Sequence, residues 1–137
     1  MKTLYTTRVT VEGGRDGHAR SADGRLDVAM ALPTALGGSG AGSNPEQLFA
    51  AGFAGCFASS IAYVARQRGL TVGPVSVVGE VDLGISEDGR YGLAARVTVS
   101  APGLLEAERD AVLSEARRIC AYSNATRGSI DVTYDFA

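Results

Sequence analysis

The sequence predicts an α+β protein in which an antiparallel sheet packs against two helices. Five short segments alternate apolar and polar residues, as strands with one buried face do. A long run without charges covers residues 48–65, and an amphipathic stretch covers residues 105–120. The length of 137 residues suits one domain, so we expect a single domain over residues 1–137.

The predicted strands carry apolar side chains at alternate positions, with charged or hydroxyl residues between them. Their inward positions are Tyr5, Thr7, Val9 and Val11; Leu26, Val28, Met30 and Leu32; Val75, Val77, Val81, Leu83 and Ile85; Leu93, Ala95, Val97 and Val99; and Ile130, Val132, Tyr134 and Phe136. This pattern is typical of an antiparallel sheet with one face in water. Residues 86–90, Ser-Glu-Asp-Gly-Arg, predict the turn of a hairpin between the third and fourth strands.

The first helix is predicted to follow a Gly/Ser-rich loop at residues 37–42. Residues 43–46, Ser-Asn-Pro-Glu, supply a capping side chain, a first-turn proline and an early acid. The helix should run from about Pro45 to Arg68 and end at Gly69. The second helix, from about Leu105 to Cys120, has its apolar residues on one stripe.

The first helix is apolar on nearly every side, which requires burial all round. Its uncharged run is long enough to span a membrane, but much of it is Ala, Gly and Ser. A central helix of a soluble protein is therefore favoured, and no membrane is expected. A sheet covers only one side of such a helix, so we expect a second copy of the chain to cover the other, as a homodimer. A stripe of small residues at helical spacing would permit that close approach: Gly52, Gly55, Cys56 and Ser59.

Composition excludes several classes of function. The net charge is −2 and no block of Lys and Arg is present, so nucleic acid is not an expected partner. The N-terminal residues alternate like a strand and include Arg8 where a signal peptide would be apolar, so we expect a cytoplasmic protein. Two cysteines and one histidine are too few for a closed zinc site, and no metal or other cofactor is expected.

The two thiols have two interpretations from the residues alone. Cys56 lies in the middle of the first helix, where apolar surroundings would raise the pKa of the thiol and make it inert. A reactive Cys56 therefore requires a cation from elsewhere in the protein. Composition favours two unrelated core thiols, because free cysteine is among the most buried residue types. If Cys56 and Cys120 meet in the fold, the protein is a redox enzyme.

Several blocks of residues occur in a distinctive order along most of the chain. They are Leu4-Tyr5-Thr6, Gly13-Gly14-Arg15-Asp16-Gly17, Asn44-Pro45-Glu46-Gln47-Leu48-Phe49-Ala50-Ala51-Gly52, Cys56-Phe57, Cys120-Ala121-Tyr122-Ser123-Asn124-Ala125-Thr126-Arg127-Gly128 and Ile130-Asp131-Val132. Together they closely resemble the organic hydroperoxide resistance proteins, the Ohr branch of the OsmC/Ohr superfamily. The ending Tyr-Ser-Asn-Ala-Thr-Arg-Gly, together with Gly-Gly-Arg, resembles Ohr more than OsmC.

This resemblance implies a thiol peroxidase that reduces organic hydroperoxides, such as alkyl or fatty acid hydroperoxides, to alcohols. The implied fold is an intertwined homodimer with antiparallel sheets that enclose central helices. Carried onto this chain, Cys56 would be the peroxidatic cysteine and Cys120 the resolving cysteine, and Arg15 with Glu46 would activate Cys56. The implied reductant is a dihydrolipoyl group on a lipoylated protein. The chain departs from the family at Ala121, where the family usually has proline, and this frees the backbone beside Cys120.

The arrangement of the activating pair is open at this stage. Ten residues separate Glu46 from Cys56, which is about 15 Å of rise on a continuous helix. Either the helix is broken near residues 50–52, or Arg15 and Glu46 serve Cys56 of the partner subunit, which we favour. Arg127 is a second candidate cation.

Three phenylalanines spaced by four, Phe49, Phe53 and Phe57, form a bulky stripe on the first helix. They are a candidate apolar channel that would favour organic hydroperoxides over hydrogen peroxide, and ordinary core packing is the alternative. Two other functions are also open: a small-ligand or acyl-binding dimer with inert core thiols, and a Cys-His hydrolase or thiol transferase that uses His18. The peroxidase and the hydrolase make opposite predictions for substitutions of Cys120 and His18.

Overall fold

Residues Met1–Leu48 form the first of two units of the chain, and residues Phe49–Ala137 form the second. The computed structural model describes all 137 residues. The single domain expected over residues 1–137 stays a prediction.

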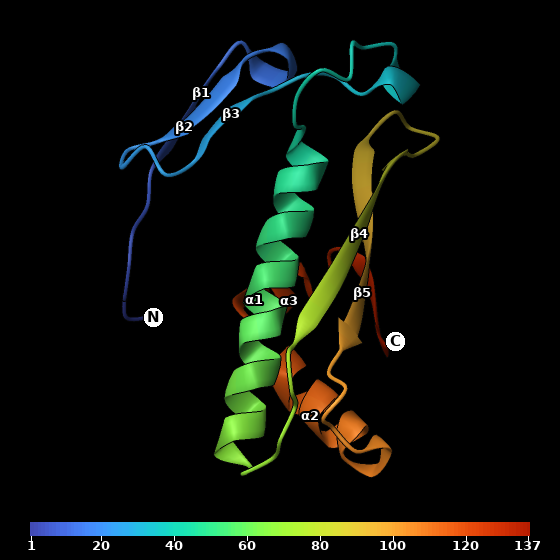
Figure 1. Ribbon diagram of the computed structural model, residues 1–137. Coiled ribbons are helices and arrows are strands. Elements are labelled where there is room, and N and C mark those ends of the chain that lie inside the picture. The colour runs from blue at the N-terminus through green and yellow to red at the C-terminus, as the bar shows by residue number, and fades with distance from the viewer. The chain divides into compact units, whose positions relative to one another are not determined.

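The first unit contains a three-stranded antiparallel sheet in the order β1-β2-β3 (Figure 1). Its strands are β1 (Val9–Glu12), β2 (His18–Ser21) and β3 (Asp27–Ala29). Two short 3-10 turns follow the strands: η1 (Gly14–Asp16) between β1 and β2, and η2 (Thr34–Leu36) after β3.

Two strand predictions in this unit need correction. The first strand begins at Val9 rather than Tyr5, and all four of its residues are exposed within the chain, so its expected buried face is absent here. Strand β2 was missed because its inward residues, Ala19 and Ser21, are too small to give an apolar alternation.

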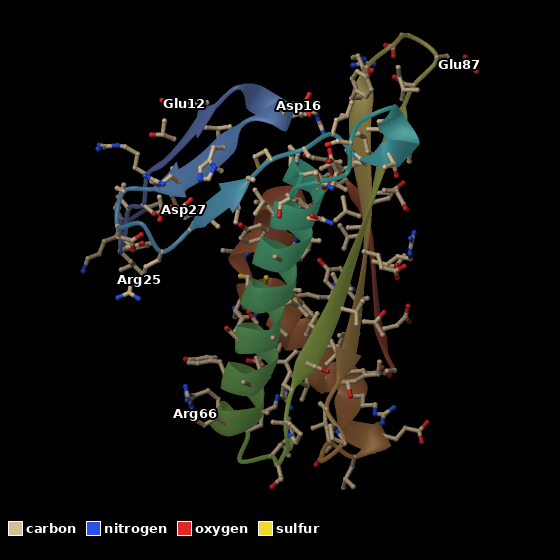
Figure 2. The ribbon with its side chains drawn as sticks, turned by 45° about the horizontal axis from the view of Figure 1, so that its top comes forward. Glu12, Asp16, Arg25, Asp27, Arg66 and Glu87 are labelled. Atoms are coloured by element: carbon tan, nitrogen blue, oxygen red, sulfur yellow. The ribbon has the colours of Figure 1, made fainter.

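The second unit contains the sheet β4-β5-β6 and most of the helical residues. Its strands are β4 (Ser76–Ile85), β5 (Tyr91–Ser100) and β6 (Asp131–Phe136). The predicted hairpin is confirmed: β4 and β5 are antiparallel, and the Ser86 N–H donates to the Arg90 carbonyl at 2.9 Å. Glu87 marks the tip of this hairpin in Figure 2.

Strand β6 runs parallel to β5, so the prediction of a wholly antiparallel sheet is wrong. Two helices separate these strands: α2 (Glu106–Ile119), which was predicted, and α3 (Ala121–Thr126), which was not. A connection of that length returns the chain to the end where β5 began, and a parallel partner requires such a crossover. Alternation within β6 shows which face is buried but carries no information on its direction.

Helix α1 (Pro45–Gln67) matches the prediction closely and continues without a break through residues 50–52. The Asn44 side-chain oxygen accepts a hydrogen bond of 2.9 Å from the Gln47 N–H and so caps its first turn. The first of the two arrangements considered for Arg15 and Glu46 required a break in this helix, and the structure has no such break.

The core of the second unit lies between α1, α2 and the sheet. Its largest fully buried side chains are Phe53, Phe57, Ile61, Val64, Val97, Val99 and Val112. Gly79 on β4 lets α1 approach the sheet, because a Cβ atom there would lie 2.9 Å from the Ala50 carbonyl oxygen. Figure 1 shows α1 beside β4 and β5. Helix α1 is long and apolar enough to cross a membrane, but core helices of soluble proteins share that property.

Candidate functional site

The fold brings the two cysteines together. Cys56 lies in the middle of α1, and Cys120 lies between α2 and α3. Their Sγ atoms are 3.3 Å apart, although 64 residues separate them in sequence. Both are free thiols; Cys56 is partly exposed, whereas Cys120 is 1% exposed. A disulfide bond is about 2 Å long, so a small side-chain movement would join them.

The bend between α2 and α3 places Cys120. Its backbone is extended, with φ −65° and ψ 123°, so it ends one helix and precedes the other. The Cys120 N–H still donates to the Ala116 carbonyl at 2.9 Å, and its own carbonyl accepts from the Asn124 N–H at 3.0 Å. The cysteine is therefore held by backbone hydrogen bonds from both helices.

The surroundings of Cys56 do not activate it. Burial raises the pKa of the Cys56 thiol, the neighbouring Cys120 raises it further, and the backbone N–H groups of Tyr122 and Ala121 oppose the shift only in part. The expectation that apolar surroundings raise the pKa of this thiol is confirmed. A thiol with a raised pKa is mostly protonated at neutral pH, so a reactive Cys56 needs an additional positive charge.

Cys120 shows the opposite behaviour. Burial alone would raise the pKa of the Cys120 thiol, but the Ser123 backbone N–H, the Cys56 thiol and the Ser123 hydroxyl together lower it below its ordinary value. The two neighbouring thiols therefore have pKa values shifted in opposite directions, that of Cys56 upward and that of Cys120 downward.

Arg15 and Glu46 form a second pair, within the first unit. The Arg15 guanidinium donates two hydrogen bonds to the Glu46 carboxylate, Nη1 to Oε2 at 3.0 Å and Nη2 to Oε1 at 2.7 Å. The turn that carries Arg15 begins at Gly13, whose φ of 74° favours glycine, and the Asp16 carboxylate anchors it by accepting from the Leu32 N–H at 3.1 Å. The Arg15 hydrogen bonds hold the pKa of Glu46 below its ordinary value. The pair is thus formed within one chain.

The three phenylalanines of the candidate channel belong to an aromatic cluster. Phe53 and Phe57 are fully buried, whereas Phe49 is partly exposed. Their rings contact Tyr122 and Tyr134, with ring centroids 5.0–6.3 Å apart. At least two of the three therefore pack in the core of this unit, and their role in a substrate channel stays a prediction.

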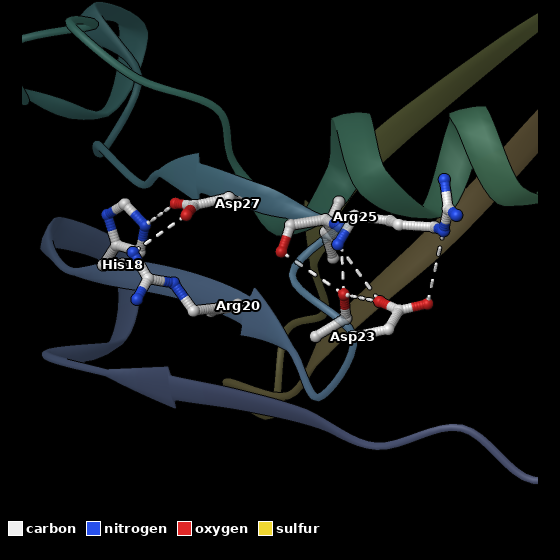
Figure 3. A network of polar contacts seen from close by, with 7 residues as sticks. His18, Arg20, Asp23, Arg25 and Asp27 are labelled. Carbon is white, nitrogen blue, oxygen red and sulfur yellow. Dashed lines mark hydrogen bonds and ion pairs between the residues drawn. The ribbon is translucent and has the colours of Figure 1, made fainter.

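His18 and Arg127 lie in other polar networks. His18 is exposed on β2 and bonds to the Asp27 carboxylate, which also pairs with Arg20 at 2.8 Å (Figure 3). The exposed Arg127 donates to the Asn124 side-chain oxygen at 2.9 Å. The chain contains no group of three or more His, Cys, Asp or Glu side chains that could hold a metal ion.

Ser123 and Tyr134 were not singled out as site residues in the sequence. The Tyr134 hydroxyl donates to the Ser123 Oγ at 2.8 Å, and the Arg117 guanidinium lies 4.6 Å from the centre of the Tyr134 ring. Ser123 in turn lowers the pKa of the Cys120 thiol. The only signal in the sequence was the position of Ser123, three residues after a cysteine that precedes a helix.

Comparisons with known proteins agree over nearly the whole chain. The family model described as OsmC-like protein matches residues 38–135. The organic hydroperoxide resistance protein of Xanthomonas axonopodis pv. citri is 44% identical over 138 residues, covering 99% of this chain and 96% of its own. The organic hydroperoxide resistance protein OhrB of Bacillus subtilis is 38% identical over 130 residues, covering 94% of this chain and 95% of its own.

Solved structures give the same result. The crystal structure of an organic hydroperoxide resistance protein from Legionella pneumophila matches with a TM-score of 0.94 and 40% identity, covering 99% of each chain. The crystal structure of B. subtilis OhrB matches with a TM-score of 0.88 and 36% identity, covering 98% of this chain and all of that one.

Proposed function

The chain belongs to the Ohr branch of the OsmC-like proteins, and from this premise we propose that it is a cysteine-based peroxidase that reduces organic hydroperoxides to alcohols. The observation that carries the proposal is the 3.3 Å separation of the Cys56 and Cys120 sulfurs. Two unrelated core thiols have no reason to meet, whereas a peroxidase that forms an internal disulfide requires it.

The proposed reaction has two steps. The Cys56 thiolate attacks one peroxide oxygen, the O–O bond breaks, and the alkoxide takes a proton and leaves as the alcohol. Cys56 becomes a sulfenic acid. Cys120 then attacks the Cys56 sulfur, a disulfide forms, and the sulfenic oxygen leaves as water. In total, two thiols lose two electrons and two protons, and the hydroperoxide becomes an alcohol and water.

Cys56 and Cys120 are well suited to these steps in different ways. The partly exposed Cys56 is accessible to a substrate, whereas Cys120 is buried against it. The pKa of Cys120 is lowered, so this thiol supplies a thiolate readily for the second step. The pKa of Cys56 is raised, so the first step depends on a cation.

Arg15 is the residue that we assign to this task, with Glu46 as its support. A guanidinium keeps its charge at all relevant pH values, and it can both stabilise a thiolate and donate to the peroxide oxygens. The bidentate contact with Glu46 orients the planar guanidinium and so keeps its position defined. We assign the pair to Cys56 of the partner subunit, which makes dimerisation part of catalysis.

The proposed active form is therefore an intertwined homodimer. In support, α1 carries a row of small exposed residues that a partner could approach closely: Ala51, Gly55, Ser59 and Ala62. The rest of the proposal follows the family: a cytoplasmic enzyme, an apolar substrate channel that includes Phe49, Phe53 and Phe57, and a dihydrolipoyl group of a lipoylated protein as reductant.

One experiment tests the function directly. Reduced protein receives one equivalent of cumene hydroperoxide or, separately, hydrogen peroxide, and intact mass and free thiols are followed over time. We expect both thiols to disappear with formation of an internal disulfide, faster with the organic peroxide. Cys56→Ser is the control and should not react. Unchanged thiols in the original protein would contradict the proposal and favour a ligand-binding protein with inert thiols.

A further inference from the structure

The two sulfurs differ in how far a reductant could reach them. Cys120 is 1% exposed and is enclosed by the core, whereas Cys56 is partly exposed. A thiolate that reduces a disulfide must contact one of its two sulfurs, so the rate depends on access to that sulfur. The other sulfur then leaves with the electron pair, and it leaves faster when its thiol has a lower pKa. In this chain, access favours attack on the Cys56 sulfur, and the lowered pKa favours Cys120 as the leaving thiolate. The two effects therefore favour the same reaction.

Three side chains near Cys120, those of Ser123, Tyr134 and Arg117, form a polar network. Ser123 is 4% exposed, and its Oγ accepts the hydrogen bond of 2.8 Å from the Tyr134 hydroxyl. Because Tyr134 is the donor in this hydrogen bond, the hydroxyl hydrogen of Ser123 is available to another acceptor, and the Ser123 side chain is one of the groups that lower the pKa of the Cys120 thiol. The Arg117 guanidinium over the Tyr134 ring holds that ring in place through a cation–π contact.

We infer that the reductant attacks the Cys56 sulfur and expels Cys120 as the leaving thiolate, with Ser123 and Tyr134 as positioning residues that stabilise this leaving group. The inference rests on the proposed function, because it concerns the disulfide which that function forms. It concerns the regeneration of the enzyme rather than its reaction with peroxide.

The electrons and bonds balance with a dithiol as the reductant. One thiolate of the dithiol attacks the Cys56 Sγ, the Cys56–Cys120 bond breaks, and Cys120 leaves as a thiolate that receives hydrogen bonds from the hydroxyl and the N–H of Ser123. The second thiol of the reductant then attacks its own mixed disulfide with Cys56. Cys56 is released as a thiolate, and both cysteines take up protons. The dithiol becomes a cyclic disulfide and has lost two electrons and two protons.

The site of attack can be identified with a monothiol as the probe. The disulfide is formed with diamide, so that the experiment does not depend on the peroxidase reaction, and 2-mercaptoethanol is added for a short time before an acid quench. The free thiol is labelled with a maleimide, and the modified peptides are identified by mass spectrometry. We expect the mercaptoethanol adduct on Cys56 and the maleimide on Cys120. An adduct mainly on Cys120 would overturn the inference.

The role of the network is tested with Ser123→Ala and Tyr134→Phe. Loss of a hydrogen bond to a charged sulfur should slow reduction of the diamide-formed disulfide by dithiothreitol about three- to tenfold in Ser123→Ala, and less in Tyr134→Phe. Ser129→Ala, an exposed serine outside the network, is the control and should be reduced at the original rate.

The titration of Cys120 distinguishes the loss of the Ser123 hydroxyl from a general structural defect of the variant, because such a defect alone would not shift this titration. In a Cys56→Ser background, Ser123→Ala should shift the pH dependence of Cys120 alkylation to higher pH, and Ser123→Thr, which keeps the hydroxyl, should largely restore it. Reduction at the original rate together with an unshifted alkylation profile in both variants would overturn the role of the network. If the protein fails to react with cumene hydroperoxide but passes these tests, the proposed function is wrong and the inference about the disulfide still holds.

Discussion

The residues around Cys56 in the second unit raise the pKa of this thiol and so make it less reactive. Burial and the neighbouring Cys120 raise the pKa of Cys56, and two backbone N–H groups compensate only in part. The chain offers Arg15 as an oriented cation, held in a bidentate contact by Glu46. A cation within about 4–6 Å lowers the pKa of an acidic group by roughly 1–3 units. The first step, attack of the Cys56 thiolate on the peroxide, should therefore depend strongly on Arg15.

Arg15→Ala should raise the pKa of Cys56, because the thiolate loses its counter-charge. At neutral pH the thiolate fraction, and with it the rate of the reaction with cumene hydroperoxide, should fall about tenfold to a hundredfold. The measurement is the ultraviolet absorbance of the thiolate against pH in a Cys120→Ser background. Arg25→Ala, an exposed arginine paired with Asp23 in a turn, is the control. An unchanged titration in Arg15→Ala would remove Arg15 from the mechanism.

The Arg15–Glu46 pair should also make stability depend on pH. The folded-state pKa of Glu46 is lowered from its ordinary value of 4.5, so the pair stabilises the fold above that pH and loses its effect as the pH falls through the folded value. Glu46→Gln should therefore have a lower unfolding midpoint than the original chain at neutral pH. The difference should disappear in acid. Denaturant unfolding over a pH series measures it, and a difference independent of pH would contradict this account.

At the scale of elements, α1 has two glycines that face different surroundings. A Cβ atom at Gly52 would lie 2.5 Å from the Tyr122 hydroxyl oxygen, whereas one at Gly55 would meet no atom within 4 Å. Gly52 therefore allows α3 to pack closely on α1, beside the two cysteines. The small-residue stripe expected to contact a partner is thus divided: Gly52 faces the chain itself, and Gly55 is open.

Gly52→Ala and Gly55→Ala should have opposite effects on stability. Alanine in place of a helical glycine gains about 1 kcal/mol from helix propensity, whereas overpacking costs about 1–3 kcal/mol. We expect Gly52→Ala to lower the free energy of unfolding by about 1 kcal/mol and Gly55→Ala to raise it slightly. Thermal or denaturant unfolding compares the two. Equal losses in both variants would show that the contact with Tyr122 is not the cause, and would point to a partner at Gly55.

At the scale of the whole molecule, the four predicted site residues form two pairs in two units. Arg15 and Glu46 belong to the first unit, and Cys56 and Cys120 belong to the second. The unbroken α1 carries both Glu46 and Cys56. A continuous helix keeps such positions about 15 Å apart along its axis. This argument favours an active site shared between subunits.

Mixed dimers test the shared site. Chains with Cys56→Ser and chains with Arg15→Ala should each be nearly inactive alone. In a mixed dimer, one of the two sites combines an intact Cys56 with an intact Arg15 of the partner subunit. Random pairing of equal amounts makes half of the dimers mixed, so about a quarter of the original activity should return. Mixed dimers as inactive as both parents would show that the residues act within one chain.

Much of the fold follows from local patterns. The cap within residues 43–46, the end of α1 near Gly69 and the hairpin at residues 86–90 were all predicted correctly, because capping and turn chemistry act over a few residues. Strand β2 and helix α3 were missed because they are short and lack an apolar period. The parallel pairing of β6 was missed because alternation does not record strand direction.

The sequence by itself determined which chemical groups the protein has: two thiols, an arginine in a glycine turn, and a glutamate at a helix start. Its motifs also determined the family. Only the tertiary structure decided that the two sulfurs lie 3.3 Å apart, that the pKa of Cys120 is lowered, and that the Tyr134 hydroxyl donates a hydrogen bond to Ser123. The physical reason is range: propensity and periodicity act between near neighbours, whereas contacts across 64 residues and the loss of solvent around a thiol arise only from packing.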